Sequence, residues 1–137
     1  MSSKLRIAVT GGSGNIGQRL CEALVARGDE VFNLDRKSPR RPAGKFIFCD
    51  LRRRELVQPI FDQVDAVCLL GEFTNPKAST PEDVYATNTA IGSTVLQTAV
   101  DAKVKRIMDT STCQTYGYWH WPVTRPDALP FDESAPL

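Results

Sequence analysis

The stretch Thr10-Gly-Gly-Ser-Gly-Asn-Ile-Gly17 determines how the rest of the chain is interpreted. It follows a short apolar run, precedes an amphipathic segment, and places glycines at positions 11, 14 and 17. Between a strand and a helix, Gly11 permits a tight turn, Gly14 lets the backbone approach a pyrophosphate, and Gly17 lets helix and strand pack closely. The first turn of the helix directs free N–H groups toward such an anion. The stretch therefore predicts a dinucleotide-binding turn, the alternative being an incidental glycine-rich turn.

Strand-like and helix-like segments alternate along the 137 residues. Short apolar or β-branched runs predict strands, and apolar residues three and four apart predict helices. The expected strands are Leu5–Thr10, Glu30–Leu34, Lys45–Cys49, Asp65–Leu70 and Lys105–Asp109, and the expected helices are Asn15–Arg27, Arg53–Phe61 (interrupted or started by Pro59) and Pro81 to about Asp101. This alternation predicts a three-layer Rossmann-type α/β sandwich, a parallel sheet of about five strands in the order 3-2-1-4-5 with helices on both faces.

Composition limits the function classes. The chain is 42% hydrophobic and 24% charged, which is typical of one globular domain over 1–137, with an irregular aromatic and proline-rich tail over 118–137. A net charge of +1 gives no basic excess for nucleic acid or an anionic membrane. Neither a signal peptide nor a membrane-length apolar window is present, so the expected location is the cytoplasm.

The four cysteines and the single histidine show no metal-binding spacing. Cys21, Cys49, Cys68 and Cys113 lie far apart, without a C-x-x-C pair, and are expected to be small buried hydrophobes. His120 stands among aromatic residues. It is either a substrate-facing acid–base group or part of an aromatic loop that packs on the sheet end.

Carboxylates follow the second and third strands. Asp35 comes 18 residues after the last glycine of the turn, where it can accept hydrogen bonds from both ribose hydroxyls of an adenosine. Its charge would repel a 2′-phosphate, which favours NAD over NADP, although Arg36 and the other cations of 36–44 form either a phosphate contact or a solvated loop. Asp50, before Leu51, could accept from the adenine amino group, cap the next helix, or do both.

Taken together, these motifs resemble the extended short-chain dehydrogenase/reductase family, the NAD-dependent epimerase/dehydratases that act largely on nucleotide sugars. The matching pieces are T-G-G-S-G-N-I-G at 10–17, Asp35, C-D-L at 49–51, D-A-V-C-L-L-G at 65–71, N-T-A-I-G-S-T at 88–94, T-S-T-C-Q-T-Y-G at 110–117 and L-P-F-D-E-S-A-P-L at 129–137. The resemblance implies bound NAD and a nucleotide-sugar or related hydroxyl or carbonyl substrate. Because family members often dimerise through the long helix, a homo-oligomer is also an expectation.

The residues expected to bind the cofactor are Gly11, Gly14, Asn15, Ile16, Gly17, Asp35, Arg36, Asp50, Leu51, Leu70, Gly71 and Asn88. The resemblance places Leu70 and Gly71 beside the pyrophosphate and the nicotinamide ribose. The family's H-x-A-A pattern is replaced there by Leu69, Gly71 and Glu72, and Glu72 would bring a negative charge near the cofactor. Asn88 lies on an apolar helix face. The resemblance makes it a hydrogen bonder on the cofactor side or one that bridges strands, and a purely structural buried amide is the alternative.

The catalytic residues are matched only in part. Thr112, with Ser111 as its neighbour, matches the family's catalytic Ser/Thr, whose hydroxyl would bond a substrate hydroxyl or carbonyl; a capping cluster at the strand end is the alternative. The family's Y-x-x-x-K pair has no counterpart, because the last lysine is Lys105 and Tyr116 belongs to the Y-G after the fifth strand. The chain is therefore expected to be a catalytically incomplete front part of a longer enzyme, truncated before that motif. A non-catalytic NAD-binding sensor or regulatory protein and a gene fragment without function remain alternatives.

Overall fold

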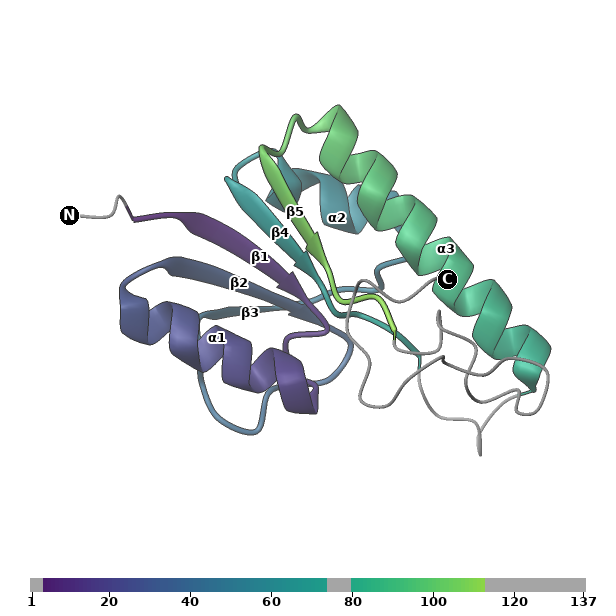
Figure 1. The fold of residues 1–137 in the computed structure, drawn as a ribbon, viewed down its shortest axis with the longest axis horizontal. Helices are drawn as coiled ribbons and strands as arrows, with labels where there is room; N and C mark the ends of the chain where they lie inside the picture. The colour runs from purple at the N-terminus through teal and green to yellow at the C-terminus, as the bar shows by residue number, and fades with distance from the viewer. Residues whose placement is uncertain (1–3, 74–79, 113–137) are drawn as a thin grey trace, which may run out of the picture.

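Five parallel strands form one sheet in the order β3-β2-β1-β4-β5 (Figure 1). The computed structural model describes residues 4–73 and 80–112. The elements are β1 (Arg6–Thr10), α1 (Asn15–Arg27), β2 (Glu30–Asp35), β3 (Lys45–Phe48), α2 (Arg54–Phe61), β4 (Ala66–Leu69), α3 (Pro81–Asp101) and β5 (Arg106–Asp109). The predicted topology is confirmed, and strand ends differ from the predicted ones by a single residue.

The strand order reverses beside β1. β1 pairs with β2 on one side and with β4 on the other, so the chain leaves β1 toward one edge of the sheet and β4 toward the other. The segments that follow β1 and β4 therefore lead away from each other, toward opposite edges of the sheet. In open α/β sheets, ligands bind in the crevice at the carboxyl ends of the strands next to such a reversal.

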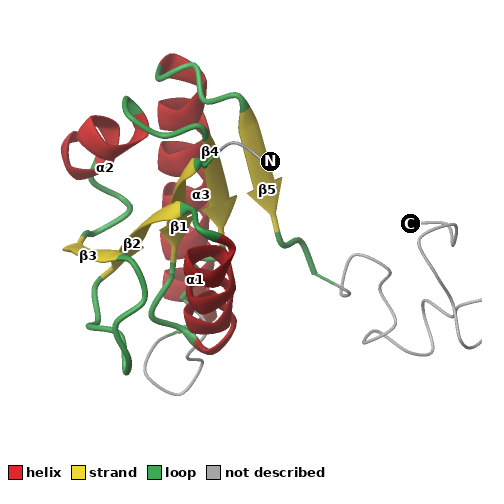
Figure 2. Ribbon diagram, turned by 90° about the vertical axis from the view of Figure 1, so that its left-hand side faces the viewer, coloured by secondary structure: helices red, strands yellow, loops and turns green. Residues whose placement is uncertain are grey.

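Helices cover both faces of the sheet, as predicted (Figure 2). Side chains alternate along each strand, which sends neighbouring residues of β1 to opposite faces. The core on the α1 face contains Ile7, Val9, Cys21, Leu24, Val31 and Ala43. The core on the face of α2 and α3 contains Ala8, Phe32, Leu34, Cys49, Leu51, Val57, Phe61, Val64, Val67, Leu69, Val95 and Ala99. The sheet is thereby anchored from both sides.

Two helix signals had different outcomes. The predicted start of α3 is confirmed, because the Thr80 hydroxyl accepts from the backbone N–H of Asp83 and the Asp83 carboxylate accepts in return from the backbone N–H of Thr80. The prediction that Pro59 interrupts or starts α2 is wrong, since Pro59 lies inside that helix. A proline removes one helical hydrogen bond, and α2 ends two residues later at the fully buried Phe61. No helix among the described residues is long and apolar enough to cross a membrane.

Candidate functional site

The N-terminus of α1 is open to a ligand. Its N-cap is Gly14, no side chain caps it, and its first turn contains no acidic residue. The first N–H groups of a helix have no partner within the helix, so they need another acceptor. At the start of α3 the Thr80 and Asp83 side chains provide such acceptors. The turn before α1 therefore leaves its amides, with their positive partial charge, for an anion.

Two glycines let backbone segments approach closely at this turn. Gly11 has a φ of +66°, and a Cβ there would lie 2.7 Å from the Leu70 carbonyl oxygen and 2.8 Å from the Cα of Gly71. At Gly17 a Cβ would collide with the Gly11 carbonyl oxygen and would lie 2.7 Å from the Cα of Gly12. The structure thus brings the turn over residues 10–17, the glycine turn, against Leu70 and Gly71. This proximity is what the binding of one ligand by both segments would require.

Gly14 differs from these two glycines. A Cβ added there would meet only the Gly11 carbonyl oxygen within 4 Å, at 3.2 Å. Its φ of −71° is allowed for any residue. Gly14 is exposed, as are Asn15 and Ile16 in the first turn of α1. The fold does not itself require a glycine at this position, so the open space above Gly14 is available to a ligand.

Thr10 joins the ends of β1 and β4. Its hydroxyl donates to the Cys68 carbonyl oxygen at 3.3 Å and accepts from the backbone N–H groups of Leu70 and Gly71 at 3.2 Å each. Thr10 is fully buried, and its bond to the Gly71 N–H is buried as well. No role for Thr10 was predicted from the sequence. The structure shows that it fixes the segment after β4 next to the glycine turn.

Asp35 is bonded to the glycine turn itself. One carboxylate oxygen accepts from the backbone N–H of Ser13 at 3.1 Å, and the other accepts from the backbone N–H of Lys37 at 2.9 Å. A carboxylate offers about four lone-pair sites. Each Asp35 oxygen therefore keeps capacity for a further donor, such as one of two adjacent hydroxyls.

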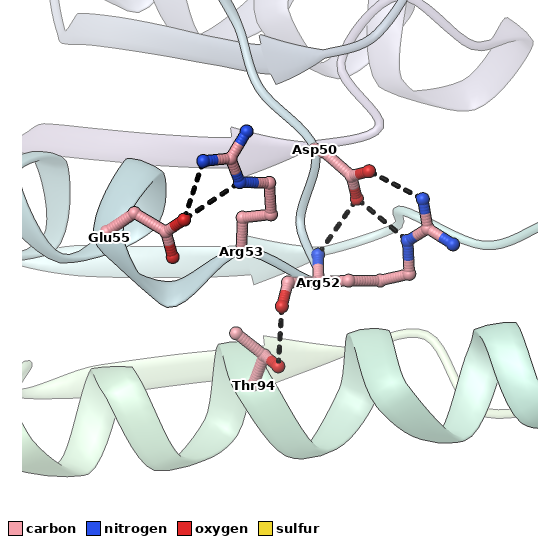
Figure 3. A network of polar contacts seen from close by, with 5 residues as sticks. All are labelled: Asp50, Arg52, Arg53, Glu55 and Thr94. Carbon is pink, nitrogen blue, oxygen red and sulfur yellow. Dashed lines mark hydrogen bonds and ion pairs between the residues drawn. The ribbon is translucent and has the colours of Figure 1, made fainter.

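Asp50 is held by Arg52 (Figure 3). The guanidinium donates to Oδ1 at 3.0 Å and to Oδ2 at 2.6 Å, and the Arg52 backbone N–H donates to Oδ1 at 3.1 Å. These hydrogen bonds from the Arg52 side chain lower the pKa of Asp50 to about 2, and the charge of Arg36 contributes. The alternative that Asp50 caps the next helix is wrong, because the N-cap of α2 is Arg53 and no side chain caps it.

Arg52 also connects this loop to the neighbouring helix. Its carbonyl oxygen accepts from the Thr94 hydroxyl of α3 at 3.5 Å (Figure 3). The Leu51 side chain packs against Gly71, where a Cβ would collide with it. The loop after β3 is therefore joined to the segment after β4. The Asp50–Arg52 ion pair was not predicted from the sequence, where the spacing of two residues was the available signal.

Asn88 is bound to the backbone of Phe73. Its Oδ1 accepts from the Phe73 N–H at 2.7 Å, and its Nδ2 donates to the Phe73 carbonyl oxygen at 3.1 Å. These bonds join α3 to the segment after β4, and the half-buried side chain keeps one further hydrogen-bonding site at each polar atom. A contact of Asn88 with the cofactor stays a prediction. Glu72, next to this contact, is exposed.

The candidate catalytic hydroxyls lie at the other edge of the sheet from Asp50. Ser111 and Thr112 follow β5 and are exposed, and Ser111 has a φ of 51°, an uncommon value for a residue other than glycine. β3 and β5 are the two edge strands, so the sheet separates Asp50 from Thr112 by its full width. Cys113, Tyr116, His120 and the segment 118–137 lie outside the described residues.

The described cysteines have unreactive surroundings. Cys21, Cys49 and Cys68 are free thiols, and burial raises the pKa of Cys21 and of Cys49 to about 11. Cys21 and Cys49 are buried as predicted, whereas Cys68 is partly exposed. Within 4–73 and 80–112 no group of three or more His, Cys, Asp or Glu residues could hold a metal ion.

Comparison with known proteins agrees with this geometry. The model of the NAD dependent epimerase/dehydratase family matches residues 7–136. A UDP-glucose 4-epimerase of Streptococcus mutans is 31% identical over 96% of this chain and 41% of that protein. A solved NAD-dependent NDP-hexosamine 5,6-dehydratase of tunicamycin biosynthesis is 34% identical, with a TM-score of 0.77 over 98% of this chain and 43% of that one.

A second solved structure contains the cofactor. It is a short-chain dehydrogenase/reductase superfamily protein from Agrobacterium tumefaciens with bound NAD, 28% identical to this chain. Its TM-score is 0.77 over 96% of this chain and 38% of that one. The chain spans about two fifths of the length of the proteins it matches.

Proposed function

The chain belongs to the NAD dependent epimerase/dehydratase family, and we propose that it forms the NAD-binding part of an enzyme that modifies a nucleotide sugar. The observation that carries this proposal is the open N-terminus of α1 beside the Asp35 carboxylate. The free N–H groups at the start of α1 can donate to an anion, and the Asp35 carboxylate can accept from the hydroxyls of a ribose. Both lie where the strand order reverses. The similar epimerase and dehydratase supply the substrate class.

Each group at this edge has a proposed task. The amides of Asn15, Ile16 and Gly17 would bind the pyrophosphate, with Gly14 allowing its approach. The Asp35 oxygens would accept from the 2′- and 3′-hydroxyls of the adenosine ribose. NAD, when bound, supplies hydride transfer at C4 of its nicotinamide.

The adenine and substrate ends complete the proposal. Asp50, held by Arg52, would accept from the adenine amino group with Leu51 packed beside it. Leu70 and Gly71 would border the pyrophosphate and the nicotinamide ribose. Thr112 would bond a substrate hydroxyl or carbonyl, with Ser111 as its neighbour. In the family the proton is moved by a Tyr–Lys pair, and residues 106–137 of this chain contain no lysine.

NAD rather than NADP is the proposed cofactor. Asp35 would place a negative charge against a 2′-phosphate. Arg41, one of the cations of the loop that follows, is paired with Glu22 of α1 at 2.9 Å. The Gln18 side chain also donates to the Arg41 carbonyl oxygen at 3.0 Å, so this loop is held against α1. These bonds favour a structural role for Arg41 over a phosphate contact.

Location and assembly are part of the same proposal. Free thiols at Cys21, Cys49 and Cys68 suit the reducing cytoplasm. Val100 on α3 is 64% exposed, and Ile107 and Met108 on β5 are 40% and 41% exposed. Ile107 and Met108 are consecutive in β5 and therefore lie on opposite faces of this edge strand. Exposed apolar residues on α3 and on both faces of β5 support a homo-oligomer.

Calorimetric titration of the chain with NAD tests the proposal. The matched variant is Gly14→Ala, whose Cβ meets only one atom of the fold but occupies the space proposed for the pyrophosphate. We expect saturable binding by the wild type, and a loss of affinity of at least about tenfold in Gly14→Ala at nearly unchanged stability. An absence of binding at millimolar NAD would refute the proposal. Hydride turnover with UDP-glucose is expected to be undetectable for residues 1–137, which lack the Tyr–Lys pair.

A further inference from the structure

Asn33 is an amide in the middle of a buried strand. It lies in β2 between Phe32 and Leu34, and its side chain is fully buried. Alternation along the strand places it on the same face as Val31, the face that α1 covers. Asparagine is rarely found at such a position, because its polar atoms lose their water. The contacts of this side chain therefore need an explanation.

The side chain reaches the glycine turn. Its Nδ2 donates to the hydroxyl oxygen of Ser13 at 3.2 Å. The amide also lies directly against Gly12, where an added Cβ would collide with its Oδ1 and lie 2.7 Å from its Cγ. Oδ1 itself has no hydrogen-bond partner. Asn33 thus packs against Gly12 and donates to Ser13 of the turn, while its Oδ1 has no hydrogen-bond partner.

Three successive residues of β2 bind this turn. The Leu34 carbonyl oxygen accepts from the Gly11 N–H at 2.8 Å. The Asp35 carboxylate accepts from the Ser13 N–H at 3.1 Å. Asn33 adds the bond to the Ser13 hydroxyl, so Ser13 is held at its backbone by the proposed ribose acceptor and at its side chain by Asn33.

We propose that Asn33 is a positioning residue for cofactor binding: through Ser13 it holds the glycine turn in the conformation that accepts the dinucleotide. This inference rests on the proposed function, since it concerns the same site. A turn that is already ordered loses less conformational freedom when it binds, which raises affinity. The unpartnered Oδ1 destabilises the folded chain. Asn33 should therefore favour binding at the expense of stability.

The opposite effects on binding and stability make the proposal testable. Asn33→Val removes the contact with Ser13 and the unpartnered oxygen together, and valine suits a buried strand. We expect its affinity for NAD to fall about fivefold to tenfold, the effect of one hydrogen bond, while its melting temperature stays equal or rises. Wild-type affinity in Asn33→Val, or a melting temperature that falls in step with affinity, would overturn the proposal.

A double-mutant cycle isolates the contact. Ser13→Ala removes the hydroxyl from a partly exposed residue and leaves β2 intact. The double variant should bind NAD no more weakly than the weaker single variant, because both remove one interaction. If the losses in NAD affinity of the two single variants multiply in the double variant, Asn33 acts independently of Ser13.

Thr98→Val is the control. Thr98 is also fully buried with an unpartnered hydroxyl oxygen, but it lies on α3, on the other face of the sheet. Its NAD affinity should equal that of the wild type, and a matching loss there would overturn the assignment.

Amide hydrogen exchange without NAD separates this inference from the proposed function. In the ligand-free chain the Ser13 amide should exchange about fivefold to tenfold faster in Asn33→Val than in the wild type, because the turn loses one of its bonds to β2. Equal exchange rates would overturn the positioning role even if the wild type binds NAD. Faster exchange in a chain that does not bind NAD would refute the proposed function and support the positioning of the turn.

Discussion

Single atoms determine how closely the turns at the carboxyl ends of the strands approach one another. The Thr10 hydroxyl joins three backbone groups, and the missing Cβ atoms of Gly11 and Gly17 allow backbone to touch backbone. Gly92 is also a helical glycine, but an added Cβ there would meet nothing within 4 Å. Among the helical glycines of residues 4–73 and 80–112, packing therefore requires Gly17 but does not require Gly92.

Alanine substitutions should distinguish these two glycines. Gly17→Ala would force a Cβ into the Gly11 carbonyl and should lower the free energy of unfolding by about 1–3 kcal/mol through overpacking. Gly92→Ala should raise it by about 0.5–1 kcal/mol, because alanine loses less backbone entropy in a helix. Urea unfolding measures both. A tolerated Gly17→Ala would contradict the contact between the turn and α1.

The Asp50–Arg52 pair should affect stability at low pH. The folded pKa of Asp50 is lowered to about 2, below the value of about 3.9 for an unfolded chain. The pair therefore stabilises the fold fully above about pH 5 and loses this effect as the pH falls through 2. Asp50→Asn should unfold more easily than the wild type at pH 6, and most of this difference should be lost by pH 2.

Arg52→Ala is the partner control for this titration. The Arg52 side chain is the main cause of the lowered Asp50 pKa, so its removal should give the same convergence with the wild type at low pH. Both side chains are partly exposed, and added salt should reduce the difference. A difference from wild type that does not change between pH 6 and pH 2 would show that the ion pair is not its source.

At the scale of elements, what the sequence predicts depends on how local the signal is. The strand order follows from the alternation of apolar runs and helical patterns, and the capping box of α3 is contained within Thr80–Asp83. The role of Asn33 depends on a contact with Ser13, 20 residues away. The only local sign was an amide inside an apolar strand. The pairing of Asp50 with Arg52 is local, but a spacing of two residues permits the pair without requiring it, and the conformation of the loop decides.

The two long helices affect the site in different ways. α1 presents an uncapped N-terminus to it, whereas α3 holds the segment after β4 from the side, through Asn88 and Phe73. Because Gly71 also contacts Gly11, a displacement of this segment would reach the glycine turn. α3 is thus expected to influence cofactor affinity although its N-terminus is already capped.

Asn88→Ala tests the contact between α3 and this segment. The substitution removes both hydrogen bonds to Phe73 and should lower the free energy of unfolding by about 1–3 kcal/mol, with weaker NAD binding. Thr89→Ala, at the exposed next position of α3, should change stability by less than about 0.5 kcal/mol. Denaturant unfolding and calorimetry measure the two effects. An Asn88 variant as stable as the Thr89 variant would show that these bonds contribute little.

At the scale of the whole molecule, the proposed site is built into the sheet rather than appended to it. β1 and β2 contribute to the cores on both faces, the glycine turn follows β1 directly, and Asp35 is the last residue of β2. A ligand that binds the turn should therefore stabilise the sheet as a unit. Such linkage amounts to about 2.7 kcal/mol when the ligand concentration is 100 times its Kd.

Thermal unfolding with each dinucleotide tests this linkage together with cofactor choice. NAD should raise the melting temperature progressively with concentration, and NADP at equal concentration should raise it less, because Asp35 repels the 2′-phosphate. Asp35→Asn removes that charge and should narrow the difference between NADP and NAD. Equal shifts by both dinucleotides in the wild type would instead indicate that the cations after β2 offset the carboxylate. Since Arg41 is already paired with Glu22, the structure favours the larger shift with NAD.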